Sequence, residues 1–499
     1  MMRTLKCVLV LVAVSIVYGQ SAGDRISPPR FWNDRDLAEW ATPVVGLDAR
    51  PGHYSEKEYY AADVGEFVRT YPVYFPGREP AGYWELLQKA KPEPLINPGT
   101  RTKEEWIRAG KQVFEELDIP YLRNYDPQLA ATVRSAEEFS KLGGHELKDG
   151  TVAGLRWVPT SKGLALNIPD CAGCHTRVMP DGTLLNGAPF PGNDVLDGVR
   201  QSFTTHTSPG FIDFYSPGET PAQIAWRFWA VPWTTDDIHE NLKSSEVNPR
   251  DFGFVSGVVP RFNGSPYYPT KVPDLIGIKD RKFIDHTATH RLRGPADLMK
   301  YAALVSCCDV AEFGSHHLLT EKGRRIAYRF SDDLAFALAE YIYSLEAPQN
   351  PNAGDPRATI GKAVFDREGC GGCHTAPLYT NNKLTVAAGF TVPPQHPLRD
   401  DIMPVSVGTD PNLALKTRKG TGLYKVPSLR GLWYRGLFNH DGSVRSLEEW
   451  FDPARLQDDY SPSGFKGYKL THRAVPGHEF GLKLSPDDKA ALIAFLKTL

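Results

Sequence analysis

The chain has 499 residues, 41% of them hydrophobic, and its 57 lysine and arginine residues nearly balance 59 aspartate and glutamate residues. This balance excludes the basic footprint of a nucleic-acid-binding protein and the polybasic patch of a membrane-surface protein. The 41 prolines and 44 glycines indicate long irregular connections between elements, as expected where loops surround a large flat group.

The first residues have the features of a secretory signal peptide. Arg3 and Lys6 precede an apolar run over 7–17, and small residues follow around Gly19. The run is too short to cross a bilayer as a helix, and no later stretch of about 20 apolar residues occurs. We therefore predict a signal peptide over 1–20, a mature protein that does not span a membrane, and a periplasmic or secreted location.

Helical periodicity begins after an N-terminal extension that we place at 21–100. Thr102 precedes a run with apolar residues at i, i+3 and i+4 spacing that ends at Leu117. Further on, Ser331 and Ser485 stand where N-caps are expected. We therefore predict a mainly α fold with long irregular loops. The same spacing predicts helices over 221–228, 297–305, 332–345, 447–451 and 486–499.

Two copies of one short motif carry the strongest chemical signal. Residues 171–175 read Cys-Ala-Gly-Cys-His and residues 370–374 read Cys-Gly-Gly-Cys-His. This pattern attaches c-type haem: the two thiols form thioether bonds to the porphyrin, and the histidine is placed to bind the iron. A zinc site would need further Cys or His pairs, and none accompanies either copy. We predict two covalently bound haem c groups, held by Cys171, Cys174, His175, Cys370, Cys373 and His374.

An aromatic cluster follows the first motif. Trp226, Trp229 and Trp233 lie within one short segment. They are candidates for the wall of a pocket at the first haem, or for a relay of electron holes between the haems. Plain core packing of an aromatic helix is the alternative that the sequence leaves open.

An internal duplication organises the chain. The run VPDLIGIKDRKFIDH from Val272 reappears as VPSLRGLWYRGLFNH from Val426, 154 residues later, and the register continues to the last residue. A shared G-K-x-V-F begins at Gly110 and at Gly361, with an insertion before the first motif. We therefore predict two cytochrome c-like haem domains, at 101–347 and 357–499, separated by a linker rich in Pro, Asn and Gly.

The two copies differ where a second iron ligand is expected. His478 in the second copy aligns with Arg324 in the first. If His478 binds the second iron, the first iron lacks that ligand, which predicts one electron-transfer haem and one reactive haem. Met403 is the competing ligand. His286 and His440 share one place in the duplication, and we expect them to support each haem, for example by hydrogen bonding to a propionate, without binding iron.

The segment 422–499, with V-P-S-L-R-G, F-N-H-D-G-S, S-L-E-E-W and G-H-E-F-G, resembles the C-terminal half of bacterial di-haem cytochrome c peroxidases and their MauG-type relatives. The wide spacing of the haem motifs is more similar to the rubber-oxygenase (Rox-type) branch. The resemblance implies a pair of helical cytochrome c domains with an N-terminal reactive haem and a C-terminal electron-transfer haem. It also allows a calcium ion between the domains, for which the sequence shows no specific carboxylate arrangement.

Two departures from the family pattern bear on iron coordination. The family's methionine ligand falls at Ala454 here, so the second haem is not ligated in that way. The segment 176–201 contains no histidine, whereas the peroxidases place a removable ligand soon after the first motif. The resemblance therefore implies a permanently open first haem.

These features lead to an expected function with two alternatives. We expect an exported di-haem oxidoreductase of the peroxidase type whose N-terminal haem reacts with hydrogen peroxide or dioxygen and whose partners include a small redox protein or an organic substrate. The alternatives are a haem dioxygenase cleaving an apolar, polyisoprenoid-like substrate, and a non-catalytic electron carrier. No nucleic acid is expected as a partner. The candidate catalytic residues are Trp226, Trp229, Trp233 and Arg324, and the candidate iron ligands are His175, His374 and His478.

Overall fold

Helices and short strands alternate along the chain, so the fold is mixed α and β rather than mainly α as predicted. None of the described helices combines the length and the apolar composition needed to cross a membrane. The predicted helix over 221–228 and the predicted signal peptide lie outside the described residues. The computed structural model describes residues 24–47, 49–141, 146–190, 231, 233, 255–259, 267–309, 312–318, 321 and 324–499.

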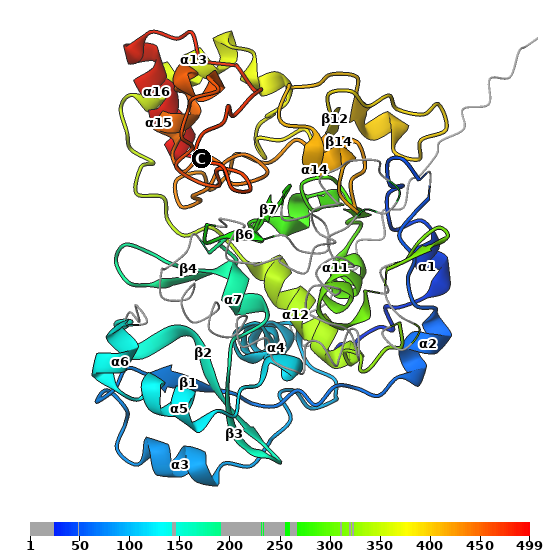
Figure 1. Ribbon diagram of the computed structural model, residues 1–499, viewed down its shortest axis with the longest axis vertical. Coiled ribbons are helices and arrows are strands. Elements are labelled where there is room, and N and C mark those ends of the chain that lie inside the picture. Colours follow the sequence, from blue (N-terminus) through cyan, green and yellow to red (C-terminus); the bar gives the residue numbers. More distant parts are fainter. Residues whose placement is uncertain are drawn as a thin grey trace, which may run out of the picture.

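One pair of helices crosses near the centre of the molecule (Figure 1). Helix α4 (Lys103–Glu116) begins at the N-cap Thr102, which forms a reciprocal capping box with Glu105. It packs against α12 (Asp332–Ser344), which begins at the N-cap Ser331. A Cβ atom at Gly110 would lie 1.9 Å from the carbonyl oxygen of Ala337, so only glycine permits this crossing.

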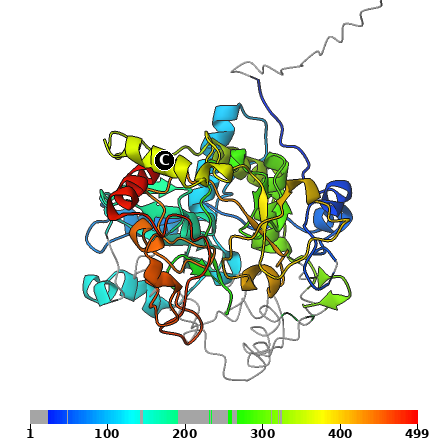
Figure 2. The same ribbon diagram turned by 90° about the horizontal axis from the view of Figure 1, so that it is seen from above.

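A second pair repeats this crossing at the other end of the molecule. Helix α13 (Ala358–Arg367) packs against α16 (Pro486–Lys497), and the two lie side by side when seen from above (Figure 2). A Cβ atom at Gly361 would lie 1.9 Å from the carbonyl oxygen of Ala491. Ala491 lies 154 residues after Ala337, so the closest approach uses matching positions in both pairs.

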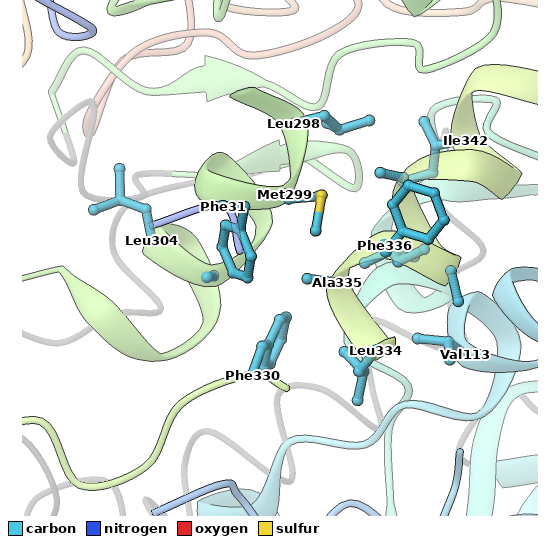
Figure 3. Packing of buried hydrophobic residues seen from close by; sticks show 14 of the residues in the cluster. Phe31, Val113, Leu298, Met299, Leu304, Phe330, Leu334, Ala335, Phe336 and Ile342 are labelled. Carbon is cyan, nitrogen blue, oxygen red and sulfur yellow. The ribbon is translucent and has the colours of Figure 1, made fainter. Parts of the chain in front are cut away.

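The largest core surrounds the first helix pair. Figure 3 shows Met299, Phe330 and Phe336 among the side chains that fill the space between α11 (Pro295–Ala303) and α12. Trp32 and Tyr59 belong to the same core, and their rings stack with centres 4.6 Å apart. The N-terminal extension, with α1 (Asp34–Ala38) and α2 (Glu56–Ala61), therefore shares one core with the helices of the first half.

A three-stranded antiparallel sheet joins one strand of the N-terminal extension to two strands of the insertion before the first motif. Strand β2 (Thr151–Thr160) lies between β1 (Tyr71–Tyr74) and β3 (Gly163–Asn167). The sheet builds a small separate core that includes Trp157 and Phe139. No sheet was predicted here, because β1 and β2 are far apart in sequence. The helices α3 (Tyr83–Lys89), α5 (Pro127–Val133) and α6 (Ala136–Lys141) adjoin it.

The predicted helices within the described residues are confirmed. Besides α4, α11, α12 and α16, the structure has α15 (Leu447–Trp450) at the predicted place. The other short elements are α7 (Cys171–His175), α14 (Asn412–Leu415), β4 (Thr176–Val178), β5 (Leu184–Asn186), β6 (Val258–Val259), β7 (Thr270–Lys271), β8 (Phe283–Ile284), β9 (His290–Arg291), β10 (Glu312–Phe313), β11 (His316–His317), β12 (Leu384–Val386), β13 (Ile402–Met403), β14 (Leu423–Lys425) and the helical turns at Pro120–Leu122, Ile278–Asp280, Leu304–Cys308, Cys370–Gly372, Arg399–Asp401 and Pro453–Leu456.

The two halves join by a reciprocal backbone exchange. The N–H of Lys271 donates to the carbonyl oxygen of His440 at 2.9 Å, and the N–H of Lys425 donates to that of His286 at 2.9 Å. The two donors, Lys271 and Lys425, lie 154 positions apart in the sequence, and so do the two acceptors, His286 and His440. Each half therefore supplies the partner that satisfies the other's backbone at this junction.

Candidate functional site

The second Cys-X-X-Cys-His segment forms a tight turn after α13. Gly369 ends the helix in the left-handed region, with φ 74°, and a 3-10 turn follows over Cys370–Gly372. The N–H of His374 donates to the carbonyl oxygen of Cys370 at 2.9 Å. This turn brings Cys370, Cys373 and His374 to the wall of one cavity.

Hydrogen bonds fix the orientation of the His374 ring. Its Nδ1 lies 3.2 Å from the carbonyl oxygen of Tyr379 and 3.1 Å from that of Pro427. Because both partners can only accept, Nδ1 carries the proton and Nε2 keeps a free lone pair. Burial lowers the pKa of His374, so its ring is neutral at neutral pH. This is the state in which a histidine binds a metal.

His478 faces His374 across the cavity. The centres of the two rings lie 6.3 Å apart. Because an imidazole nitrogen binds a metal ion at about 2.0–2.1 Å, two imidazoles on opposite sides of one metal have ring centres roughly 6 Å apart. Burial, with a smaller contribution from nearby His374, lowers the pKa of His478 to about 4. The two rings therefore fit an iron ion between them.

The loop that carries His478 is held from several directions. Its backbone lies in the left-handed region, with φ 49°, and its N–H donates to the carbonyl oxygen of Val407 at 2.6 Å. The fully buried guanidinium of Arg455 donates to the carbonyl oxygens of Gly477 at 2.8 Å and His478 at 3.0 Å. Trp450 packs against the imidazole, with ring centres 5.3 Å apart. The loop is thus anchored by contacts with the protein itself.

The cavity between the two histidines is apolar over most of its wall and basic on one side. A porphyrin needs this combination, because its flat ring is apolar and its two propionates are charged. The residues present therefore fit a haem. The apolar wall includes Phe365, Leu432, Phe438, Leu447, Phe451, Leu492 and Leu496, and the basic side includes Lys271, Lys425 and Arg435 together with His286 and His440.

Met403, the competing ligand, does not line this cavity. It lies on β13, and its sulfur accepts a hydrogen bond from Asn381 Nδ2 at 3.2 Å. The geometry therefore favours His478 over Met403 as the partner of His374.

The first Cys-X-X-Cys-His segment forms α7 and leads into the β4–β5 hairpin. Asp170, just before it, accepts a hydrogen bond from Ser306 Oγ at 2.7 Å, which ties the motif to the helical turn Leu304–Cys308 that follows α11. The N–H of Gly187 donates to the carbonyl oxygen of His175 at 2.7 Å. Residues 191–230 follow directly and lie outside the described part of the chain.

The β10–β11 hairpin brings together two of the four candidate catalytic residues. Trp233 packs on one side of it, with ring centres 5.0 Å from Phe313 and 5.4 Å from His316. Arg324 lies at the paired residues Glu312 and His317, donating to Glu312 Oε1 at 3.1 Å. Trp226 and Trp229 lie outside the described residues.

Sequence reasoning missed several residues of the second site. Lys271 and Lys425 lie 154 residues apart, as do Arg281 and Arg435, so extending the duplicated run by one residue would have found the lysines. Arg455 has no such signal, because its partners are backbone carbonyls that only the fold brings together. Among the described residues, no cluster of three or more histidine, cysteine or carboxylate side chains offers a calcium site.

Comparison with known proteins agrees with the resemblance that the motifs indicate. The cytochrome-c peroxidase IdrP1 of Pseudomonas sp. (strain SCT) is 29% identical over 166 residues, which cover 30% of this chain and 41% of that protein. The chain thus matches less than half the length of this curated relative. The match to this relative supports the likeness to cytochrome c peroxidases that the motifs indicate. No family model matches the chain.

Two solved structures also match. Hydrazine synthase of Kuenenia stuttgartiensis, pressurised with xenon, aligns over 58% of this chain and 90% of its own, with 15% identity and a TM-score of 0.28. A MauG-like protein associated with microbial copper homeostasis aligns over 57% of this chain and 90% of its own, with 15% identity and a TM-score of 0.30.

Proposed function

We propose that the protein is an exported di-haem c-type oxidoreductase of the peroxidase type. Cys171, Cys174 and His175 would hold the haem at which hydrogen peroxide or dioxygen reacts. The second haem, which passes electrons, would be held by Cys370, Cys373, His374 and His478. The observation that carries the proposal is the opposed pair His374 and His478, whose ring centres lie 6.3 Å apart in one cavity. In the first copy, the position that matches His478 is Arg324.

The chain's own residues have distinct tasks in this proposal. His374 and His478 would both bind the iron of the second haem and so keep oxygen ligands from it. Arg324, which is hydrogen-bonded to Glu312 and His317, would offer no ring nitrogen to the iron of the first haem. When bound, the haems supply the redox chemistry, and the protein orients them and limits access of water.

The repeated helix crossing supports two haem domains related by internal duplication, at 101–347 and 357–499. Gly110 meets Ala337 and Gly361 meets Ala491 at the same separation, and each glycine precedes its own Cys-X-X-Cys-His motif. Two unrelated helix pairs would have no reason to place their closest contact at the same register. Export rests on the predicted signal peptide and on the haem class.

The test is the absorption spectrum of the purified holoprotein, oxidised and reduced, with and without cyanide and peroxide. We expect one high-spin and one low-spin ferric haem, binding of one cyanide per chain, and peroxide-dependent oxidation of a reduced small redox protein. If neither haem binds cyanide or carbon monoxide, the protein is an electron carrier. Oxygen uptake with a polyisoprenoid in the absence of peroxide would assign the oxygenase reaction instead.

A further inference from the structure

A second, smaller cavity lies beside the cavity between His374 and His478. Lys271, Lys425 and Arg435 line both cavities. The smaller one extends to Pro189, next to the residues that follow the first Cys-X-X-Cys-His motif. A group of cations therefore stands between the two haem-binding segments.

These cations come in pairs from the duplication. Lys271 matches Lys425, and Arg281 matches Arg435. The buried carboxylate of Asp274 lies 3.8 Å from each of the two arginines and also accepts a hydrogen bond from Tyr434. Its own counterpart, 154 residues later, is Ser428, so the second copy lacks the carboxylate that the first copy has.

On the side of the second cavity, Lys271, Lys425 and Arg435 make no hydrogen bond to a carboxylate among the described residues. Arg435 Nε is buried and has no hydrogen-bond partner. Lys271 Nζ donates only to the carbonyl oxygen of Leu437, at 2.9 Å, and Lys425 Nζ has no hydrogen-bond partner among the described residues. Burial lowers the pKa of both lysines to about 7, although the charges of Asp274 and Asp441 act to raise that of Lys271 and the charge of Asp285 acts to raise that of Lys425. Buried cations in proteins are normally paired.

We propose that Lys425, Lys271 and Arg435 form a carboxylate-binding site that takes the propionates of the haem between His374 and His478. The propionate would stand where the second copy lacks its aspartate. The inference rests on the proposed function, because it requires a haem at Cys370 and Cys373. A cation beside the haem edge favours the reduced iron, since reduction adds a negative charge to the site.

The test measures the midpoint potential of the low-spin haem by spectroelectrochemical titration of the full-length holoprotein. We expect Lys425→Met to make its reduction about tenfold less favourable, which lowers the midpoint potential by about 59 mV for one electron. Lys425→Arg should restore most of this shift, because arginine keeps the charge. Lys383→Met is the matched control: Lys383 lines the smaller cavity but is exposed, so water screens its charge. The propionate bending band in the resonance Raman spectrum should shift in Lys425→Met alone.

Each outcome decides the inference. An unchanged potential and Raman band in Lys425→Met, with both haems attached, would overturn it, and so would an equal shift in Lys383→Met. If Lys425→Met loses the second haem, retention by Lys425→Arg would support a requirement for charge, whereas loss in both would point to packing and overturn it. A wild-type protein without haem at Cys370 and Cys373 would instead refute the proposed function.

Discussion

The two Cys-X-X-Cys-His segments follow the same helix crossing but enter different surroundings. The segment at 370–374 turns into a cavity whose far wall carries His478. The segment at 171–175 continues into a β-hairpin, and the residue that matches His478 is Arg324, which is engaged with Glu312 and His317. Under the proposed function, the same kind of helix crossing would therefore serve two coordination chemistries, with the difference lying in the segments that follow each motif.

The largest expected effect would make the second site resemble the first. Under the proposed function, His478→Ala removes the ligand that faces His374 across the cavity, so the low-spin haem should become fully high-spin. Cyanide binding should rise from one to two per chain, as measured by absorption titration. Met403→Leu is the control and should leave the spectrum as in the wild type. A low-spin haem that survives in His478→Ala and disappears in Met403→Leu would assign the methionine instead.

The next effect concerns buried charge, which the two regions handle differently. Near the first motif, Asp297 is 3% exposed and binds Lys300, which is 1% exposed, at 3.0 Å. Asp297→Asn leaves that ammonium buried without its main partner, so we expect a loss of about 3–5 kcal/mol in the free energy of unfolding. The matching positions in the second region are Phe451 and Ala454, which carry no charge. Denaturant unfolding measures the effect, with Asp459→Asn, at an exposed aspartate, as a control whose midpoint should not move.

The same carboxylate predicts a pH dependence. Burial alone would raise the pKa of Asp297, but the hydrogen bonds from Arg293 and the charge of Lys300 lower it below its ordinary value. A carboxylate with a lowered pKa stabilises the folded protein at pH values above the pKa of an unfolded aspartate, about 3.9. This stabilisation is lost as the pH falls through the lower pKa of the folded state. Asp297→Asn should therefore flatten the acid side of the stability curve. An unchanged acid limb would show that other carboxylates dominate it.

A smaller effect tests whether the two crossings are equivalent. Gly110→Ala and Gly361→Ala each force a methyl group against a backbone carbonyl, so we expect each to cost about 1–3 kcal/mol in unfolding free energy. Gly354→Ala, in the linker, meets no atom within 4 Å and should be neutral. Thermal unfolding with both variants compares the two halves directly. A penalty confined to one variant would break the equivalence.

The smallest effect concerns the support of the His478 loop. Arg455→Lys keeps the charge but replaces a planar group that reaches several carbonyls by one ammonium, so at least one charge-assisted hydrogen bond is lost. We expect His478 to bind more weakly by about 1.5 kcal/mol. The readout is a high-spin fraction that grows on warming, followed by absorbance. Arg445→Lys, at an exposed arginine nearby, should behave as the wild type.

Local signals in the sequence were the reliable ones. The helices that begin at Thr102, Ser331 and Ser485 were predicted because a cap and an apolar stripe are written in consecutive residues. The sheet was missed because β1 pairs with β2, where Tyr71 lies opposite Trp157. Such a pairing between residues far apart in the sequence leaves no local pattern. Fold class was therefore predicted as too helical.

The candidate site divides in the same way. The haem motifs and His478 followed from short motifs and from the register of the duplication, and the structure places His374 and His478 face to face. Arg455 could not be predicted, because a buried arginine bonded only to backbone carbonyls depends on the final path of the chain. The roles of Trp233 and Arg324 stay predictions, with both residues at one hairpin.

The backbone exchange at the junction has a consequence for biosynthesis. Because Lys271 is satisfied by His440 and Lys425 by His286, neither half completes its own edge. A chain cut in the linker at 346–357 would leave two fragments with matching open edges, which favours their reassociation over independent survival. A polypeptide that ended before His440 would leave the N–H of Lys271 without this partner, so we expect such a truncated chain to be more sensitive to proteolysis.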